Sequence, residues 1–262
     1  MSKVIVITGS TKGIGYGLAE EFLKRGHNVV VSGRKQDALD NAVAKLSAQY
    51  KDQVAGCLCD VTKLEDNEQL FAFAKEKFGR VDIWVNNAGV AHPMTNVWEL
   101  PLDLIHDVVN ANVLGTIYGS RVAIKGMLAQ GGGWIYNLEG FGSSGRVMAG
   151  LSVYGMTKAA AAFFGKSLAK EVANTSVKVA TLQPGMVITD MVTGQYKTPE
   201  ELNKVKPIFN IIANRVSDVV PWLAAQMLTN EKNGALLQYQ PRWKLLLRFA
   251  TAPFIKRNAF DD

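Results

Sequence analysis

Apolar residues in this chain form short continuous runs that alternate with longer amphipathic stretches. The runs KVIVITG (3–9), NVVVSGR (28–34) and VDIWVNNAG (81–89) are typical of strands buried on both faces of a parallel sheet. The stretches between such runs carry apolar residues at helical spacing. They predict helices over 16–26, 36–49, 64–78, 102–129 and 152–173, with further strands over 54–61, 133–140, 177–185 and 235–239.

This alternation of strand and helix predicts right-handed crossovers and a parallel sheet covered by helices on both faces. The 262 residues suit one α/β domain, and neither an internal repeat nor a low-complexity linker divides them. We therefore expect a single α/β domain over residues 1–262.

One irregular region, residues 190–214, interrupts the alternation. Within it TPEE predicts a helix start, with Thr198 as cap, Pro199 at the first helical position and Glu201 reaching back. We expect a small helical flap over a ligand cleft, outside the carboxyl ends of the strands where open α/β sheets bind ligands. Its apolar side chains are equally compatible with ordinary packing.

The C-terminal stretch 242–257, RWKLLLRFATAPFIKR, predicts an amphipathic helix interrupted at Pro253. One face is apolar, with Trp243, Leu246, Leu247 and Ala250, and another is basic, with Lys244 and Arg248. Such a stretch can lie at a membrane interface, cover the substrate mouth or pack against a neighbouring subunit. The three placements stay open at this point.

The composition, with 48% hydrophobic and 20% charged residues, is that of a soluble globular protein. The chain passes directly into a strand and holds no apolar run as long as a membrane span, so we expect a cytoplasmic protein, peripheral to a membrane if the tail binds one. His27, His92 and His106 have no metal-ligand spacing with the cysteines, which argues against a metal site.

A net charge of +6 and a pI near 9.2 suit an anionic partner, such as nucleic acid, an anionic membrane or a phosphate-rich cofactor. Because no basic run with interleaved aromatics precedes the tail, we expect no nucleic-acid partner.

The stretch TGSTKGIG (8–15) joins the first predicted strand to the first helix and favours dinucleotide binding. Gly9 permits a tight turn, and Gly13 and Gly15 let backbone and helix approach closely. The helix N-terminus then offers amide groups and partial positive charge to a pyrophosphate. Glycines alone are weak evidence, but their position between a strand and a helix strengthens it.

Two cations near this loop predict NADPH rather than NADH. An NAD site usually has an acid at the end of the second strand, whereas this chain has Arg34 there and Lys12 inside the glycine loop. Both could bind a 2′-phosphate, and both could simply face solvent. Asp60, after the third strand, could accept a hydrogen bond from an adenine amino group, or could be a helix cap or turn former.

The pentapeptide YGMTK places Tyr154 and Lys158 on one face of a helix. A neighbouring ammonium lowers the pKa of a phenol by favouring phenolate, so this pair could pass a proton to a carbonyl oxygen while a hydride reaches the carbon. The same spacing also arises by chance on many helices, so the interpretation depends on the other motifs.

Together TGSTKGIG, CDV with Asp60, NNAG (86–89), NVLG with Asn112, YGMTK and PGMVITDM (184–191) resemble the short-chain dehydrogenase/reductase family over nearly the whole chain. The resemblance implies a Rossmann-like doubly wound sheet of about seven strands and a homo-oligomer formed through the long helices.

The same resemblance implies roles for individual residues. Tyr154 is the acid, Lys158 lowers its pKa and holds the nicotinamide ribose, and the backbone of Asn112 holds a proton-relay water. Gly89 shapes the cofactor bed, and Thr189 touches the nicotinamide carboxamide. The remaining implied cofactor contacts come from the same motifs: Thr11, Ile14, Val61, Asn87, Ala88, Pro184, Gly185 and Val187.

The catalytic serine of the family is missing. Its usual NISS is NLEG here, so Glu139 and Gly140 replace the serines. Ser143 and Ser144 follow in a loop bracketed by glycines, and either is a candidate substitute donor. Glu139 could donate only if it were protonated, which needs a desolvated site.

One branch of the family, the chlorophyll b reductases, carries an acid followed by glycine at this place, and NLEGFGSSGR (137–146) and RFATAPFIKRNAF (248–260) resemble it. That resemblance implies reduction of the 7-formyl group of chlorophyll b to a hydroxymethyl group with NADPH. The expected substrate is thus an apolar aldehyde or ketone, with chlorophyll b as the specific candidate. The alternatives are a general aldehyde or ketone (alcohol) dehydrogenase of the same family and a non-catalytic dinucleotide sensor or partner-binding protein.

Overall fold

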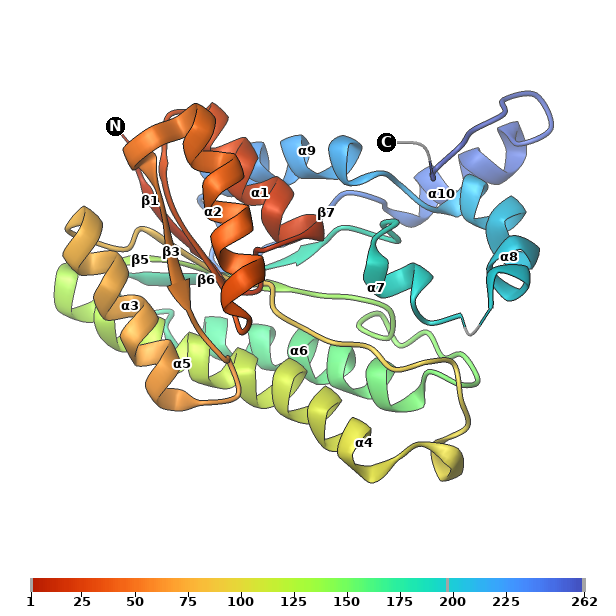
Figure 1. Ribbon diagram of the computed structural model, residues 1–262, viewed down its shortest axis with the longest axis horizontal. Coiled ribbons are helices and arrows are strands. Elements are labelled where there is room, and N and C mark those ends of the chain that lie inside the picture. Colours follow the sequence, from red (N-terminus) through yellow and green to blue (C-terminus); the bar gives the residue numbers. More distant parts are fainter. Residues whose placement is uncertain (1, 197, 261–262) are drawn as a thin grey trace.

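The computed structural model describes residues 2–196 and 198–260, which build one sheet of seven parallel strands (Figure 1). The spatial order is β3-β2-β1-β4-β5-β6-β7, so the winding direction reverses between β1 and β4. This is the doubly wound α/β fold that the sequence predicts, and the reversal marks where such sheets bind ligands. The strands are β1 (Val4–Ile7), β2 (Asn28–Gly33), β3 (Val54–Leu58), β4 (Ile83–Asn86), β5 (Gly133–Leu138), β6 (Val177–Gln183) and β7 (Leu236–Gln238).

Helices cover both faces of the sheet (Figure 1). One layer contains α1 (Gly13–Lys24), α2 (Gln36–Tyr50) and α9 (Val216–Thr229), and the other contains α3 (Leu64–Phe78), α5 (Gly115–Gln130) and α6 (Ser152–Glu171). Successive strand residues point to opposite layers, so Ile5 and Ile7 pack in the first core and Val6 in the second. Burial on both faces is the reason that each inner strand reads as a continuous apolar run.

The helix predicted over 102–129 is a composite. It contains α4 (Leu102–Val109), a π-helix (Asn110–Leu114) and α5, which follow one another without a break. Within the π-helical turn the Asn112 carbonyl accepts a hydrogen bond from Thr116 Oγ1 at 2.8 Å. A π-helical turn inserts one residue into a helix and frequently lies at a functional site.

The segment predicted as a flap contains α7 (Asp190–Thr193) and α8 (Pro199–Ile212), and its residue 197 lies outside the described residues. As predicted, Thr198 Oγ1 caps α8 by accepting from Glu201 N at 3.3 Å. The two ends of the segment meet at a neck, where Asn214 N donates to Met186 O at 2.9 Å and Ile188 N donates to Asn214 O at 3.0 Å. Residues 186–214 therefore form a loop closed at its base.

The C-terminal stretch forms α10 (Arg242–Thr251), which packs beside α8 beyond the end of the sheet (Figure 1). Arg248 Nη2 donates to Asn214 Oδ1 at 2.6 Å, and Arg248 Nη1 donates to Ala213 O at 3.3 Å. The tail is thus attached to the neck of the flap segment.

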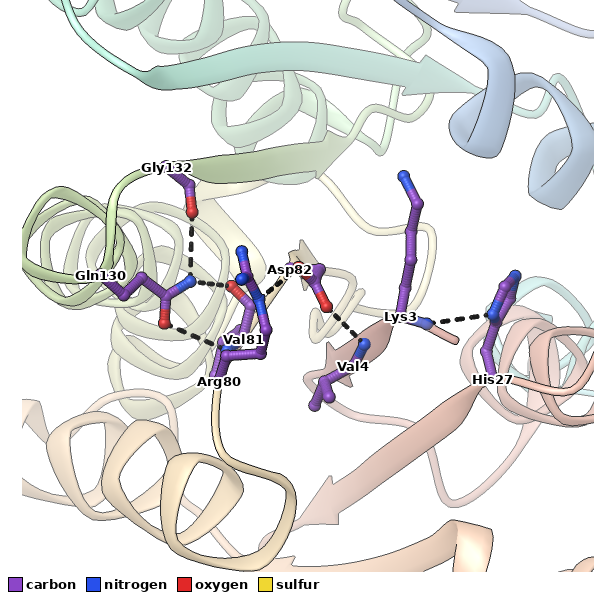
Figure 2. A network of polar contacts seen from close by, with 8 residues as sticks. All are labelled: Lys3, Val4, His27, Arg80, Val81, Asp82, Gln130 and Gly132. Atoms are coloured by element: carbon purple, nitrogen blue, oxygen red, sulfur yellow. Dashed lines mark hydrogen bonds and ion pairs between the residues drawn. The ribbon is translucent and has the colours of Figure 1, made fainter. Parts of the chain in front are cut away.

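A polar network lies at the opposite, amino ends of the strands (Figure 2). Asp82 accepts from Val4 N at 2.8 Å and pairs with Arg80 at 2.7 Å. Gln130, at the end of α5, donates to Val81 O at 2.6 Å and accepts from Val81 N at 3.2 Å. These bonds satisfy backbone groups near the start of β1 and β4. The network therefore lies at the opposite end of the strands from their carboxyl ends.

No helix in residues 2–196 and 198–260 is long and apolar enough to cross a bilayer. The same residues contain no group of three or more His, Cys, Asp or Glu side chains that could hold a metal ion.

Candidate active site

A cleft of about 1570 Å³ opens at the carboxyl ends of the strands. Of the site residues that the sequence predicts, all but Asn112 line this cleft. They are Gly9, Thr11, Lys12, Gly13, Ile14, Gly15, Arg34, Asp60, Val61, Asn87, Ala88, Gly89, Ser143, Ser144, Tyr154, Lys158, Pro184, Gly185, Val187 and Thr189. Residues far apart in the chain therefore share one continuous space.

The glycine loop is held against the NNAG segment. Asn87 Nδ2 donates to Thr8 O at 2.8 Å and to Gly9 O at 3.0 Å. Gly9 has a φ of +61°, and a Cβ added there would lie 2.7 Å from Ala88 Cα. Only glycine satisfies both the backbone angle and this close approach.

The start of α1 provides the donors that a dinucleotide needs. Lys12 is the N-cap residue of α1 and makes no side-chain cap hydrogen bond, and the first turn contains no acid. The backbone N–H groups of Gly13, Ile14 and Gly15 begin a helix at the wall of the cleft. Such unpaired amides, together with the positive end of the helix dipole, fit a pyrophosphate.

The polar groups farther along the cleft are those predicted to read the adenosine end. Arg34 is exposed at the end of β2. Lys12 Nζ pairs with Asp190 Oδ2 at 2.8 Å, with both side chains more than 70% exposed. Asp60 Oδ1 accepts from Thr62 N at 3.1 Å and Thr62 Oγ1 at 2.8 Å, so Asp60 forms a turn of the kind considered from the sequence while also facing the cleft.

Tyr154 and Lys158 lie one turn apart on α6, and both side chains are buried. Lys158 Nζ is 5.9 Å from the centre of the Tyr154 ring and donates to Leu138 O at 3.3 Å. Burial raises the pKa of Tyr154 to about 12 and lowers the pKa of Lys158 to about 8, with the Glu139 carboxylate opposing the second shift. The lowered pKa that the sequence predicts for Tyr154 is therefore wrong in direction, because desolvation of the phenol outweighs the nearby amine.

Gly140 lies directly beside the Tyr154 hydroxyl. A Cβ added at Gly140 would lie 2.7 Å from Tyr154 Oη and 3.1 Å from Lys158 Cγ. The tyrosine hydroxyl thus occupies space that a serine side chain at position 140 would need. The change from serine to glycine is consistent with the packing around Tyr154.

The side-chain amide of Gln183 connects Glu139 and Ser143, two of the three candidate substitute groups. Gln183 Nε2 donates to Glu139 Oε2 at 3.0 Å and to Ser143 Oγ at 3.3 Å, and Gln238 Nε2 donates to Gln183 Oε1. Since Gln183 supplies the hydrogen, the Ser143 hydroxyl keeps its own proton for another acceptor. Ser144 is exposed, whereas Ser143 is half-buried.

Asn112 does not line the cleft, and its side chain is 2% exposed. Its amide accepts from Val90 N at 2.8 Å and donates to Val90 O at 2.9 Å and Thr157 Oγ1 at 3.0 Å. The side chain therefore joins the segment after β4 to α6. Whether its backbone also holds a relay water stays a prediction.

His92, which is 1% exposed, has a role that the sequence motifs did not indicate. Its Nε2 accepts from Tyr154 N at 3.2 Å, and its Nδ1 lies 2.8 Å from Pro93 O. The ring satisfies a first-turn amide of α6, as a capping side chain would. Its position in the sequence could have indicated this role. His92 follows NNAG closely, and residues just after a parallel strand lie at the edge of the sheet where the cleft opens.

Comparison with known proteins places this arrangement in a family. The family model described as short chain dehydrogenase matches residues 3–200. This chain belongs to the short-chain dehydrogenases. Solved structures agree with that membership: the 3-ketoacyl-(acyl-carrier-protein) reductase from Brucella melitensis complexed with NADH is 26% identical, with a TM-score of 0.78 over 90% of this chain and 96% of that one.

A second solved short-chain dehydrogenase-like structure is the closed form of serine dehydrogenase complexed with NADP+. It is also 26% identical, with a TM-score of 0.78 over 92% of this chain and 95% of that one. The two titles name NADH and NADP+ respectively. They support a nicotinamide dinucleotide as the cofactor of this short-chain dehydrogenase, without distinguishing the two forms.

Two relatives with curated names come from Arabidopsis thaliana. Chlorophyll(ide) b reductase NOL is 37% identical over 88% of this chain, and the probable chlorophyll(ide) b reductase NYC1 is 34% identical over 98% of it. Both names carry the word chloroplastic. The matched region spans 67% of NOL and 54% of NYC1, so the chain covers only about half the length of the second relative. The resemblance of this short-chain dehydrogenase to chlorophyll b reductases is confirmed.

The buried amine of Lys158 predicts a cost to stability that depends on pH. Below pH 8 the amine is charged in both states, and the folded state bears the cost of burying the charge. Between its folded pKa of about 8 and the ordinary 10.5, only the unfolded chain keeps the proton, so the stability of the wild type rises with pH. Lys158→Met should therefore be more stable than wild type at pH 7, by up to about 3 kcal/mol, and the difference should shrink toward pH 10.

Urea unfolding at several pH values measures this difference. Lys166→Met is the matched control, because Lys166 is exposed on the same helix and should give no such pH-dependent gain. A Lys158→Met variant that is less stable than wild type by a constant amount at every pH would contradict the prediction.

Proposed function

We propose that this protein reduces a carbonyl group with NADPH, and that its substrate is the 7-formyl group of chlorophyll b, which becomes 7-hydroxymethyl. The observation that carries the reaction type is the buried Tyr154–Lys158 pair facing a dinucleotide-sized cleft. The substrate rests on the likeness to NOL and NYC1, which reaches 98% of this chain in NYC1. The glycine at 140 leaves room for the Tyr154 hydroxyl, which an added Cβ there would approach to 2.7 Å.

The residues around the hydroxyl support proton donation to a carbonyl oxygen. When bound, the reduced dinucleotide supplies the hydride. A pKa of about 12 keeps Tyr154 protonated at neutral pH, so the phenol can donate to the oxygen of the substrate. Lys158 is mostly charged below its pKa of about 8 and stabilises the phenolate left on Tyr154.

The cofactor preference is assigned to the cations near the glycine loop. The amides at the start of α1 would hold the pyrophosphate, and Arg34 with Lys12 would hold the 2′-phosphate of NADPH. The ion pair of Lys12 with Asp190 is exposed, so exchanging Asp190 for a phosphate costs Lys12 little.

Ser143 is assigned as the replacement for the missing serine. Its hydroxyl lines the cleft and accepts from Gln183, which leaves its own proton for the substrate oxygen. Ser144 is exposed and has the weaker claim.

The flap segment is assigned as the cover for an apolar substrate. Met186, Phe209 and Ile212 line the cleft and belong to one apolar cluster, in which Phe209 is buried. An apolar wall suits a large, poorly soluble aldehyde or ketone.

Self-association through the long helices and a cytoplasmic location both stay predictions. For the first, Phe163 and Met156 on α6 are 75% and 55% exposed, which supports a contact between copies along that helix. Sedimentation equilibrium measures this association.

The first experiment incubates the purified protein with NADPH and detergent-dispersed chlorophyll b and separates the pigments by chromatography. We expect 7-hydroxymethyl chlorophyll a from the wild type and a rate at least about a hundredfold lower from Tyr154→Phe, since the acid is lost. The variant should still bind NADPH. If small aldehydes but not chlorophyll b oxidise NADPH, the proposed reductase activity would stand and the proposed pigment substrate would be wrong.

The cofactor assignment predicts that Arg34→Ala weakens NADPH binding roughly ten- to a hundredfold and leaves NADH binding nearly unchanged, because only NADPH carries the 2′-phosphate. Dissociation constants from fluorescence titration test this. Lys35→Ala is the control, since Lys35 is the neighbouring exposed cation and does not line the cleft. Equal losses for both dinucleotides would remove Arg34 from this role.

The replacement-donor assignment predicts that Ser143→Ala lowers kcat on the order of a hundredfold, because a donor to the developing oxyanion is lost. Ser144→Ala should leave kcat nearly unchanged and serves as the matched control. If neither substitution slows turnover, the oxygen must be held by another group.

A further inference from the structure

The apolar side of the tail helix α10 faces solvent, and the side with Lys244 and Arg248 faces the protein. Trp243, Leu246 and Leu247 are 62%, 71% and 55% exposed, and Phe254 and Ile255 beyond the helix are 87% and 56% exposed. Amphipathic helices normally bury the apolar face, so this orientation is reversed. We call these five residues the tail patch. Exposed apolar side chains gathered in this way mark an interaction site.

Specific hydrogen bonds hold the helix in this orientation. Arg248 donates to Ala213 O and to Asn214 Oδ1, and Lys244 Nζ donates to Tyr239 O at 3.2 Å and lies 4.8 Å from the centre of the Tyr239 ring. Rolling the helix over to bury the tail patch would break these bonds and leave Asn214, which is 0% exposed, with fewer partners.

The end of the tail is anchored as well. Arg257 Nη1 donates to Ile211 O at 3.0 Å, and Ala259 N donates to Asn210 Oδ1 at 3.0 Å. The Phe260 ring stacks on Phe209, with ring centres 6.3 Å apart. The tail patch is therefore presented by a segment that is fastened on both sides.

The charge of the tail indicates the partner. Of the five cations in residues 242–260, Lys244, Arg248 and Arg257 bond to the protein, whereas Arg242 and Lys256 are exposed beside the tail patch. This range contains no acid, and the acids of the tail, Asp261 and Asp262, follow it in the sequence. If a second copy of the chain packed on this patch across a two-fold axis, the exposed cations of the two copies would lie close together and repel each other. An anionic lipid surface complements them instead, and a tryptophan beside leucines and cations is suited to the bilayer interface.

We propose that the tail patch docks this protein on the surface of an anionic lipid bilayer. Exposed Arg242 and Lys256 would lie at the headgroups, while Trp243, Leu246 and Phe254 enter the interface. Docking of this kind goes beyond the reduction proposed above and does not depend on it.

The same geometry brings the cleft toward the membrane. Arg242 and Leu245 of α10 line the cleft, so its far end opens next to the tail patch. A membrane-dissolved aldehyde would then have a short path to Tyr154, a consequence that does rest on the proposed function.

Co-sedimentation of the full chain with lipid vesicles tests the docking. The wild type should bind vesicles of phosphatidylcholine containing about a quarter phosphatidylglycerol, bind phosphatidylcholine alone more weakly, and lose binding as salt rises. The double variant Trp243→Ser/Leu246→Ser should bind the anionic vesicles at least about tenfold more weakly.

A matched control is available elsewhere on the surface. Trp98 and Leu102 are 79% and 72% exposed, so Trp98→Ser/Leu102→Ser removes the same side chains at similar exposure and should keep vesicle binding. NADPH binding by each variant reports that the fold is intact.

Three outcomes would contradict the docking proposal: the wild type does not bind anionic vesicles, the control variant loses as much vesicle binding as the tail variant, or the tail variant binds vesicles as well as the wild type. In the last case, a change from dimer to monomer in sedimentation would identify a second copy as the occupant of the patch. Failure to reduce chlorophyll b would leave the vesicle result untouched.

Discussion

The backbone that follows β4 runs half-buried along the wall of the cleft, where its polar groups need partners. The partners it finds assemble the site. Ala88 N donates to Thr8 Oγ1 at 3.0 Å, which holds the glycine loop, while both backbone groups of Val90 bond to the amide of Asn112. His92 then accepts from the backbone of Tyr154. One segment thus links the glycine loop, the π-helical turn and α6.

Much of the fold could be predicted because its signals are local. Strands buried on both faces need continuous apolar runs, and the run from Val4 to Ile7 is completely buried. The glycine loop could be identified because a close approach such as that of Gly9 to Ala88 excludes any side chain. The site residues could be grouped because parallel strands all end at one edge, although Asn112 proved to lie behind the cleft rather than in it.

The remaining features depend on contacts that no local pattern records. A π-helical turn shifts the apolar pattern by only one residue, so the composite helix around Asn112 reads as one continuous helix in the sequence. The direction of the pKa shift of Tyr154 depends on how deeply the phenol is buried, not on its spacing from Lys158. The orientation of α10 depends on distant acceptors for Arg248, and a helical pattern cannot specify them.

The neck that joins Met186 to Asn214 has a consequence for how recognition can change in this fold. Because the two ends of the loop are already paired with each other, a change in the length of the loop between them need not disturb the sheet. The entropy of closing a loop rises only slowly with its length, so a longer or shorter loop would burden folding little. The residues that the sheet brings to the cleft could therefore stay in place while the part of the loop beyond Thr189 changes to accept a molecule of another shape.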